Sequence, residues 1–393
     1  MTNEIQIVAA ARTPIGRLGG ALASFPALHL GEFAIRGALK NAGIAPGRVT
    51  DAIIGNVLQA GAGQAPARQA ALRAGLPQST RCATISKMCG SGLEAVILGA
   101  RALSLGEAEL VVAGGMESMS NAPYLLSGAR QGWRLGHQQA VDSLIHDGLW
   151  DPHYNVHMGT CADQCAQQHG ITREQQDDYA AESFRRANAA QSSGRFSDEI
   201  CPVESVDRSG EATVVAHDEG PAKVDYEKIP RLRPAFGNEG TVTAANASGI
   251  NDGAAVLVLK NENCGATADL RPLARIVSYA SHSHDPKMFL SAPIDAARVA
   301  LARAKWDVAD VDVWEVNEAF AVVPLLFARE LGIDHGKMNI RGGAISLGHP
   351  IGASGARILV TLLAALRERN GRRGVAAICI GGGEGLALCV EMS

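Results

Sequence analysis

Two patterns of hydrophobic residues alternate along the chain. Short runs rich in Val, Ile and Ala, which are typical of buried strands, occur at 4–11, 108–115, 311–317 and 375–383. Between them lie Ala- and Leu-rich stretches with helical spacing of apolar residues, at 32–44, 92–106, 295–306 and 355–371. This alternation predicts an α/β fold with mostly parallel sheets.

The two ends of the chain repeat one pattern. Residues 91–118 and residues 354–385 each run from Ser-Gly through an apolar helix and a strand to Gly-Gly. Upstream, "DAIIGNVLQ" corresponds to "DVWEVNEAF", with Asn56 and Asn317 in equivalent places after a strand. Chance similarity of Ala-rich helices would not reproduce the order of these landmarks. We therefore expect two copies of one α/β unit.

Between the copies the composition changes. The intervening sequence holds irregular stretches, a polar helix at 172–194 and a long loop with three prolines at 218–240. Long insertions of this kind are usually functional, so we expect a lid or a ligand-binding subdomain. The predicted domains are a first half at 1–118 with 249–271, a loop domain at 119–248, and a second half at 272–393.

Composition and charge exclude several classes of protein. The chain has 393 residues and a net charge of −4, which gives no electrostatic basis for binding nucleic acid. Its eight cysteines lack the spacing of a disulfide framework, which indicates reduced thiols. The N-terminal residues predict a strand rather than a signal peptide, and the longest apolar runs are too short to cross a membrane. We expect a cytoplasmic protein that binds neither nucleic acid nor membranes.

Four residues with useful chemistry lie where strands end or helices begin. Cys89 precedes a helix within "KMCGSG", where the helix dipole would lower the pKa of the thiol. His349 lies at a second glycine-rich helix start, Cys379 at the end of a strand, and Asn317 after another strand. Active sites of α/β folds form at this edge of the sheet. A Cys with a nearby His forms an activated nucleophile, and flanking glycines allow backbone N–H groups to form an oxyanion hole.

Each of these residues alone also has a structural explanation. A small buried Cys suits a tight turn, and the glycine clusters lack the spacing of dinucleotide-binding or phosphate-binding loops. Metal ligands could be imagined at Cys161 and Cys165, at His153 and His157, or in "HSHD" at 282–285. None of these groups is a complete set at metal-site spacing, so we expect no metal.

Several motifs in a fixed order carry a resemblance to a known family. They are "RTPIG" (12–16), "KMCGSG" (87–92), "GGMESMS" (114–120), "HMG" (157–159), "LRPAF" (232–236), "GTVTAANASGINDGAA" (240–255), "NEAFA" (317–321), "GGAISLGHPIGASGAR" (342–357) and "CIGGG" (379–383). Over essentially its whole length the chain resembles the thiolases, most closely the biosynthetic acetyl-CoA acetyltransferases. The resemblance implies the thiolase fold, with two βαβαβαββ units in a five-layered α-β-α-β-α arrangement and an inserted loop domain.

The resemblance also implies an activity. Two acetyl-CoA molecules would condense reversibly to acetoacetyl-CoA and CoA through an acyl-enzyme on Cys89, with no cofactor, in a homotetramer built as a dimer of dimers. The nearest alternative is a 3-ketoacyl-CoA thiolase for longer or functionalised chains. A decarboxylating ketosynthase would carry a second His at the position of Cys379, and a non-catalytic CoA-binding protein would not need all the reacting residues. Glu384 departs most from the family pattern. We expect its side chain to face either the active site or a polar network.

The resemblance assigns roles residue by residue. Cys89 is similar to the family's nucleophile, His349 to the group that accepts its proton, and Cys379 to the base that deprotonates the second acetyl-CoA. His349 with a water held by Asn317 resembles the first oxyanion hole, and the N–H groups of Cys89 and Gly381 resemble the second. The substrate contacts implied by the resemblance are His157, Phe236, Ala244, Ser248, Met288, Ala319 and Phe320.

Overall fold

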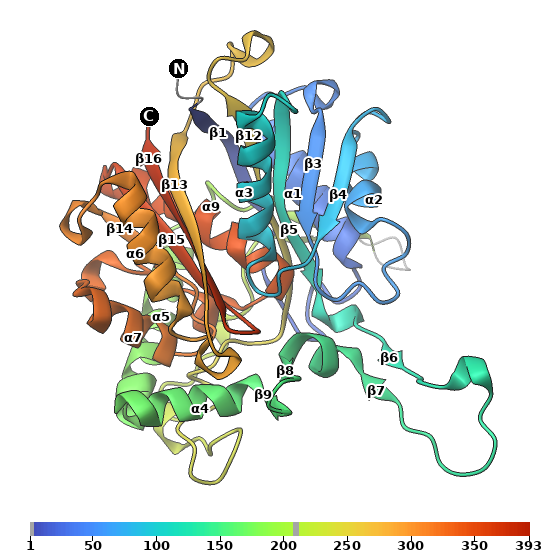
Figure 1. Ribbon diagram of the computed structural model, residues 1–393, viewed down its shortest axis with the longest axis vertical. Helices are drawn as coiled ribbons and strands as arrows, with labels where there is room; N and C mark the ends of the chain where they lie inside the picture. Colours follow the sequence, from blue (N-terminus) through green and yellow to red (C-terminus); the bar gives the residue numbers. More distant parts are fainter. Residues whose placement is uncertain (1–3, 207–211) are drawn as a thin grey trace.

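The first half of the chain forms one side of a long sheet. The computed structural model describes residues 4–206 and 212–393. On this side the strands lie in the order β4-β3-β5-β12-β1, and Figure 1 shows them in blue and teal with β12 in yellow. Their bounds are β1 Ile5–Arg12, β3 Asp51–Gly55, β4 Arg81–Ile85, β5 Leu110–Ser118 and β12 Asn251–Asn261, with the short β2 Gly16–Arg17 paired to β12.

The second half continues the same sheet. Its strands lie in the order β14-β15-β16-β13, and β13 pairs with β1 through three residues of each strand. Their bounds are β13 Ala274–Ser283, β14 Val313–Val316, β15 Arg373–Ile380 and β16 Glu384–Met392. The outer strands are parallel (β4, β3 and β5 in the first half, β14 and β15 in the second), and the strands toward the centre pair antiparallel. The predicted duplication is therefore confirmed. Most pairings of the described sheet are antiparallel, so the prediction of mostly parallel sheets is wrong.

Helices fill the space between the two halves and cover their outer faces. The first half is covered by α1 (Ala27–Asn41) and α2 (Pro66–Arg73), and the second by α6 (Ala292–Ala304) with α7 (Val322–Leu331). Between the halves, α3 (Ser91–Ser104) packs against α9 (Ile351–Arg369), as Figure 1 shows near the centre. This is the predicted five-layered α/β arrangement.

The helix α9 is buried on every side. All of its residues from Ile351 to Leu366 are buried, and among them only Arg357 carries a charge. A helix that is apolar all round is stable only inside a core, so this sequence belongs in the central layer and not on the surface. The short helix α8 (Ala344–Leu347) lies just before it.

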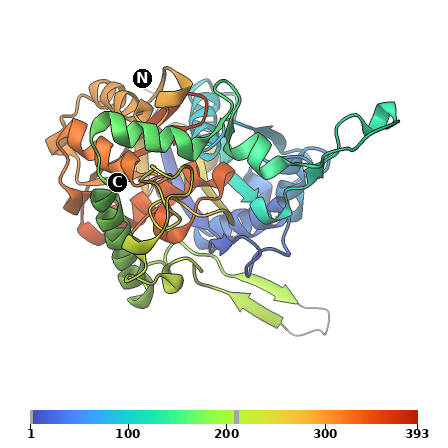
Figure 2. The same ribbon diagram turned by 90° about the horizontal axis from the view of Figure 1, so that it is seen from below.

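In the part that the structure describes, the inserted region contributes two helices and three small pairs of strands. The helices are α4 (Met158–His169) and α5 (Arg173–Ser192); the predicted cap Thr172 begins α5, in a capping box with Gln175. The pairs are β6 Tyr124–Leu125 with β7 Val141–Asp142, β8 Trp150–Asp151 with β9 Val156–His157, and β10 Val203–Val206 with β11 Ala212–Val215. Figure 2 shows the first and third extending away from the sheets.

The remaining helical segments are short. A π-helical turn spans Leu144–Leu149, and single 3₁₀ turns lie at Pro46–Arg48, Met119–Asn121, Ala129–Gln131, Pro221–Lys223, Ile229–Arg231, Gly265–Thr267, Pro286–Met288, Val308–Asp310 and His335–Lys337. Among the helices described, none has the length and apolar composition to cross a membrane. The exact domain boundaries stay a prediction, and residues 1–3 and 207–211 of the predicted domains lie outside the described residues.

Candidate active site

A strained turn holds Cys89 two residues before the start of α3. Met88 has φ 45°, in the left-handed region that a side chain other than glycine rarely adopts. Ser91 stabilises this conformation, because its Oγ donates to the carbonyl of Met88 at 2.6 Å and accepts the N–H of Lys87 at 2.8 Å. Cys89 itself is buried. Its sulfur is therefore presented by a rigid turn rather than by a mobile loop.

The Cys89 turn packs directly on the end of β15, where the loop with Gly381 and Gly383 begins. A Cβ atom at Gly90 would overlap the side chain of Ile380, so only glycine permits this approach. Gly383, farther along the same loop, has φ +90° and lies too close to the carbonyl of His284 for any side chain. The N–H groups of Gly381 and of Cys89 lie close enough to the Cys89 sulfur to oppose the rise in its pKa. The two donors predicted for the second oxyanion hole thus converge at the nucleophile.

His349 lies two residues before α9 and is held by Ser354. The Oγ of Ser354 is 2.6 Å from His349 Nδ1 and donates its proton to the carbonyl of Pro350 at 2.9 Å. A hydroxyl has one proton, so it must accept from Nδ1–H, and this assigns the lone pair of the neutral imidazole to Nε2. Nε2 is buried without a hydrogen-bond partner among the described residues. It is free to accept a proton.

Cys379 and Asn317 lie at the carboxyl ends of β15 and β14, as predicted. Both are fully buried. The backbone N–H of Asn317 donates to Ala377, while both polar atoms of its side chain have no partner among the described residues. A buried amide without partners is costly unless something polar occupies the space beside it. Asn317 therefore suits the predicted task of holding a polar group in the site.

Cys89 and His349 open into one cavity of about 370 Å³. Its wall is mainly apolar, and His157 stacks on Phe236 with ring centroids 4.5 Å apart. The predicted substrate contacts that line it are His157, Phe236, Ala244, Ser248, Ala319 and Phe320. The structure thus brings together residues from both sheet halves and from the inserted region, and their roles in binding stay predictions.

One predicted contact lies elsewhere. Met288 is half-buried and does not belong to the cavity wall, whereas its neighbour Phe289 is buried and lines the cavity. The sequence signal was a bulky residue in "DPKMFL", and either Met288 or Phe289 fits that description. The backbone just before α6 directs the second of these two side chains, that of Phe289, toward the cavity.

Comparisons with known proteins agree with this geometry. The chain matches "Thiolase, N-terminal domain" over residues 5–263 and "Thiolase, C-terminal domain" over residues 270–392. The chain belongs to the thiolase family. It is 49% identical to an acetyl-CoA acetyltransferase of Cupriavidus necator, over 99% of each chain, and 51% identical to acetyl-CoA acetyltransferase 2 of Arabidopsis thaliana, over 99% of this chain and 97% of that one.

Solved structures give the same family. The acetyl-CoA acetyltransferase of Bacillus anthracis superposes with a TM-score of 0.96 at 41% identity, covering 100% of this chain and 99% of that one. Human mitochondrial 3-ketoacyl-CoA thiolase superposes with the same TM-score at 40% identity, covering 100% of both chains. The fold is therefore common to an acetyl-CoA acetyltransferase and a 3-ketoacyl-CoA thiolase, and the fold alone does not separate the two.

Burial determines the protonation states of the reacting groups in this thiolase. Burial raises the pKa of Cys89 to about 11, against the effect of the N–H groups that face its sulfur. Burial, followed by the charge of Arg357, lowers the pKa of His349 to about 3. Burial, followed by the nearby Cys89, raises the pKa of Cys379 well above its usual range. The expectation that the helix start lowers the pKa of Cys89 is therefore wrong for the unliganded protein, because desolvation of the thiolate outweighs the helix dipole.

Sequence reasoning missed Glu117, a buried carboxylate that braces the thiolase site. It accepts the N–H groups of Val57, Leu58 and Gly352 and the side-chain amide of Asn56, at distances between 2.7 and 3.2 Å. Burial nevertheless raises its pKa to about 7. The available signal was a single acidic residue in the otherwise uncharged strand "LVVAGGMES", where a carboxylate must have a structural or chemical partner.

The orientation of Glu384 favours a structural role. Its carboxylate forms an ion pair with Lys87, on the turn that carries Cys89. Both side chains are partly exposed, at 34% for Glu384 and 26% for Lys87. The charge of Glu384 is thereby balanced, and the pair connects the nucleophile turn to the start of β16. This geometry supports the polar-network alternative.

The raised pKa of Cys89 predicts slow alkylation of the free enzyme. Loss of activity with iodoacetamide should accelerate steadily from about pH 7 to about pH 9, because the thiolate fraction grows about ten-fold per pH unit below the thiol pKa. Mass spectrometry of the peptide around Cys89 should follow the same profile. A rate that levels off below about pH 8 would instead indicate a stable thiolate–imidazolium pair in the resting enzyme.

Ser354 acts through His349 as a positioning residue. Replacing it in the variant Ser354→Ala removes the acceptor of Nδ1–H, so part of the imidazole should adopt the tautomer that carries its proton on Nε2. We expect kcat to fall by roughly ten-fold or more, with little change in KM. The variant Ser346→Ala is a matched control, since that hydroxyl contacts Ser183 and Gly343 instead of His349. Equal losses in both variants would contradict the assignment.

Proposed function

We propose that this thiolase is an acetyl-CoA acetyltransferase, which condenses two acetyl-CoA molecules to acetoacetyl-CoA and CoA and also runs in reverse. The observation that carries the proposal is that Cys89 and His349 line one apolar cavity, with the backbone N–H groups of Cys89 and Gly381 close enough to the Cys89 sulfur to act on its pKa. The names of the bacterial and plant relatives support it. CoA thioesters are substrates here, so no cofactor is required.

The first half-reaction is acyl transfer to Cys89. The lone pair of His349 Nε2 accepts the thiol proton as the sulfur attacks the thioester carbonyl, and the same proton then passes to the departing sulfur, so that CoA leaves as a thiol. A thiol with a raised pKa beside an imidazole with a lowered pKa does not ionise readily alone. Proton transfer and attack are therefore coupled to substrate binding. The N–H groups of Cys89 and Gly381 stabilise the charge on the carbonyl oxygen.

The second half-reaction forms the carbon–carbon bond. The thiol of Cys379 first gives its proton to the neutral His349, and the resulting thiolate removes a proton from the methyl carbon of the second acetyl-CoA. The enolate attacks the acetyl group on Cys89, whose sulfur leaves and recovers its proton from His349. Protonated His349 donates from Nε2, and together with a water held by Asn317 it stabilises the enolate oxygen. Two separate donor sets are needed because charge develops on different oxygens in the two steps.

A second pocket, of about 250 Å³, adjoins the cavity and supports the choice of CoA. The two pockets share part of their wall, including Ala244 and Gly249. The outer pocket is lined by the cations Arg17, Lys223 and Lys228. Its position and charge suit the phosphate groups of CoA, while the apolar cavity suits the pantetheine arm.

Assembly and location belong to the same proposal. We infer a cytoplasmic homotetramer with a role in fatty acid metabolism. The hairpin of β6 and β7 projects from the body (Figure 1) and exposes Leu126, Trp133 and Leu135, the last of them 99% exposed. Exposed apolar side chains on a projecting arm favour contact with another copy of the chain. Analytical ultracentrifugation that finds only monomers would contradict the tetramer.

The two thiols should serve separable half-reactions. In the variant Cys379→Ala, exchange of labelled CoA into acetyl-CoA should persist, while acetoacetyl-CoA synthesis should fall by at least about 1000-fold, since a general base is lost. In Cys89→Ser both should be lost, because a hydroxyl is a much poorer nucleophile near neutral pH.

The acyl-enzyme gives an independent measurement of the same assignment. Native protein incubated with labelled acetyl-CoA should carry the label on the peptide around Cys89, and so should Cys379→Ala. Label on another residue, or none, would reject Cys89 as the nucleophile. Equal loss of exchange and condensation in Cys379→Ala would mean that Cys379 instead supports the structure or activates Cys89.

Phe289 is the residue expected to limit acyl chain length. It is buried in the wall of the cavity that contains Cys89. Phe289→Ala should raise kcat/KM for the thiolysis of six-carbon and eight-carbon 3-ketoacyl-CoAs relative to acetoacetyl-CoA by roughly ten-fold, because the added space accepts extra methylene groups. Met288→Ala, outside the cavity wall, is the control. A native enzyme that already prefers the longer chains would favour the 3-ketoacyl-CoA alternative.

A further inference from the structure

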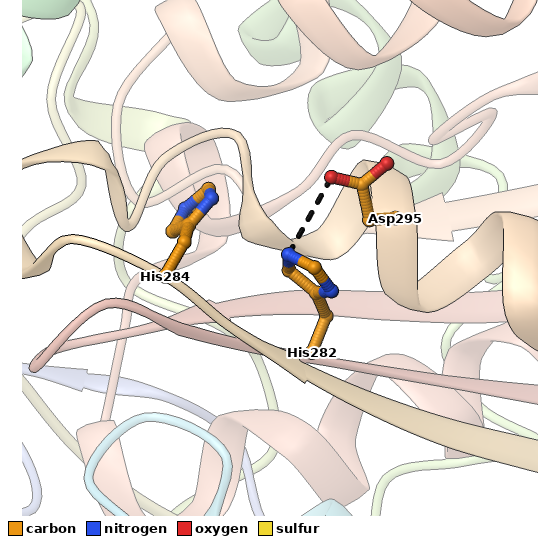
Figure 3. A group of neighbouring side chains, drawn as sticks. All are labelled: His282, His284 and Asp295. Carbon is orange, nitrogen blue, oxygen red and sulfur yellow. Dashed lines mark ion pairs between the residues drawn. The ribbon is translucent and has the colours of Figure 1, made fainter.

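Three metal-binding side chains meet outside the active cavity. His282 lies near the end of β13, His284 follows that strand, and Asp295 lies in the first turn of α6. One ligand atom of each residue lies within 4.8 Å of those of the other two. Figure 3 shows a ring nitrogen of His282 directed at the carboxylate of Asp295; the separation of Nε2 and Oδ2 is 3.6 Å. The two imidazole rings are nearly perpendicular, with centroids 5.3 Å apart.

This cluster differs from the one that the sequence offered. In the run "HSHD", Asp285 is the apparent third ligand, but its carboxylate accepts hydrogen bonds from the hydroxyl of Tyr154 at 2.8 Å and from the backbone N–H of Lys287 at 3.0 Å. Asp295, ten residues farther along, takes its place. The set was incomplete in the sequence because its third member comes from a different element.

We propose that His282, His284 and Asp295 bind a divalent transition-metal ion of the zinc type. Two imidazoles and one carboxylate are donors that this class of ion prefers, and water completes a tetrahedral site. Ligand atoms around such an ion are about 3.4 Å apart. The separation of His282 from Asp295 is already close to this value, and a shift of about 1 Å of the His284 ring would complete the set.

The surrounding contacts prepare the side chains for a metal. His284 Nε2 lies 2.7 Å from the carbonyl of Met288, which can only accept, so the proton is on Nε2 and Nδ1 carries the lone pair. Asp295 Oδ1 accepts from Arg298 at 2.9 Å, which leaves Oδ2 directed at His282. Such outer contacts orient the ligands of metal sites and limit the entropy lost on binding.

A metal here would connect two elements on either side of the loop that carries Phe289. Its ligands lie before and after this loop, on β13 and α6. The N–H of His284 also donates to the carbonyl of Gly383 at 2.9 Å, in the loop that begins with Gly381. Binding would therefore stabilise the cavity wall and the oxyanion loop from behind, without adding a ligand to the reacting groups.

Isothermal titration of the metal-free full-length protein with zinc chloride tests the proposal. We expect one equivalent to bind, with a rise in melting temperature, and binding at least about ten-fold weaker in His282→Gln and in Asp295→Asn. His137→Gln, which changes an exposed histidine on the projecting arm, should bind like the native protein. Melting temperatures measured in EDTA should agree among all the variants, which separates lost binding from lost folding.

Titration with cobalt(II) identifies the ligand atoms. The site should give the visible bands of nitrogen and oxygen ligation without the ultraviolet absorption of a cobalt–thiolate bond. The proposal is overturned if the native protein binds no equivalent of zinc, if both ligand variants bind it as tightly as the native protein, or if thiolate absorption shows that a cysteine holds the ion.

Discussion

The close contact between α3 and α9 is the constraint on which the site depends. At Gly92 a Cβ atom would lie 2.8 Å from the backbone nitrogen of Ala356, and at Gly355 it would lie 2.5 Å from that of Leu93. Each helix thus contributes one glycine that admits the backbone of the other. Their N-terminal ends are held at a fixed separation, and the turns before them carry Cys89 and His349. A side chain at either glycine would push the two helices apart. It would thereby increase the distance between Cys89, the predicted nucleophile, and His349, its predicted base, without touching either residue.

The residues predicted to react could be placed at one edge of the sheet from the sequence because their signals are local. A strand, a turn and a helix start are each encoded within a few residues, so the edge of the sheet that carries the site could be inferred from pattern alone. Contacts between distant segments carry no such signal. Glu117 becomes a partner of Gly352 only through the packing of the two halves, and Asp295 becomes a neighbour of His282 only through the packing of α6. The pKa of Cys89 was misjudged for the same reason, since burial is a property of the assembled fold.

The duplication relates the active site to a second, inactive position. The strand β3, which ends just before Asn56, pairs with β5. The strand β14, which ends just before Asn317, pairs with β15 in the corresponding register. That register makes Asn56 equivalent to Asn317 and Glu117 equivalent to Cys379. The Ser-Gly landmarks of the two central helices extend the relation, because they make Cys89 the counterpart of Gly352. Each position therefore combines the strand ends of one half with the helix start of the other.

The chemistry of the two positions differs in one respect. In the first, Glu117 accepts the side-chain N–H of Asn56 and the backbone N–H of Gly352, so the position is a brace, while the Oδ1 of Asn56 has no partner among the described residues. In the second, a thiol replaces the carboxylate. A thiol is a weak hydrogen-bond acceptor, so Cys379 cannot bind the amide of Asn317 as Glu117 binds that of Asn56. Within the described part of the chain, the Asn317 side chain has no partner. The same backbone geometry therefore supports a rigid structural contact where the side chain is the carboxylate of Glu117. Where the side chain is the thiol of Cys379, it leaves room for reactants. Because the Asn317 side chain is not engaged by a strong internal hydrogen bond, it can interact with the charge that develops on a substrate.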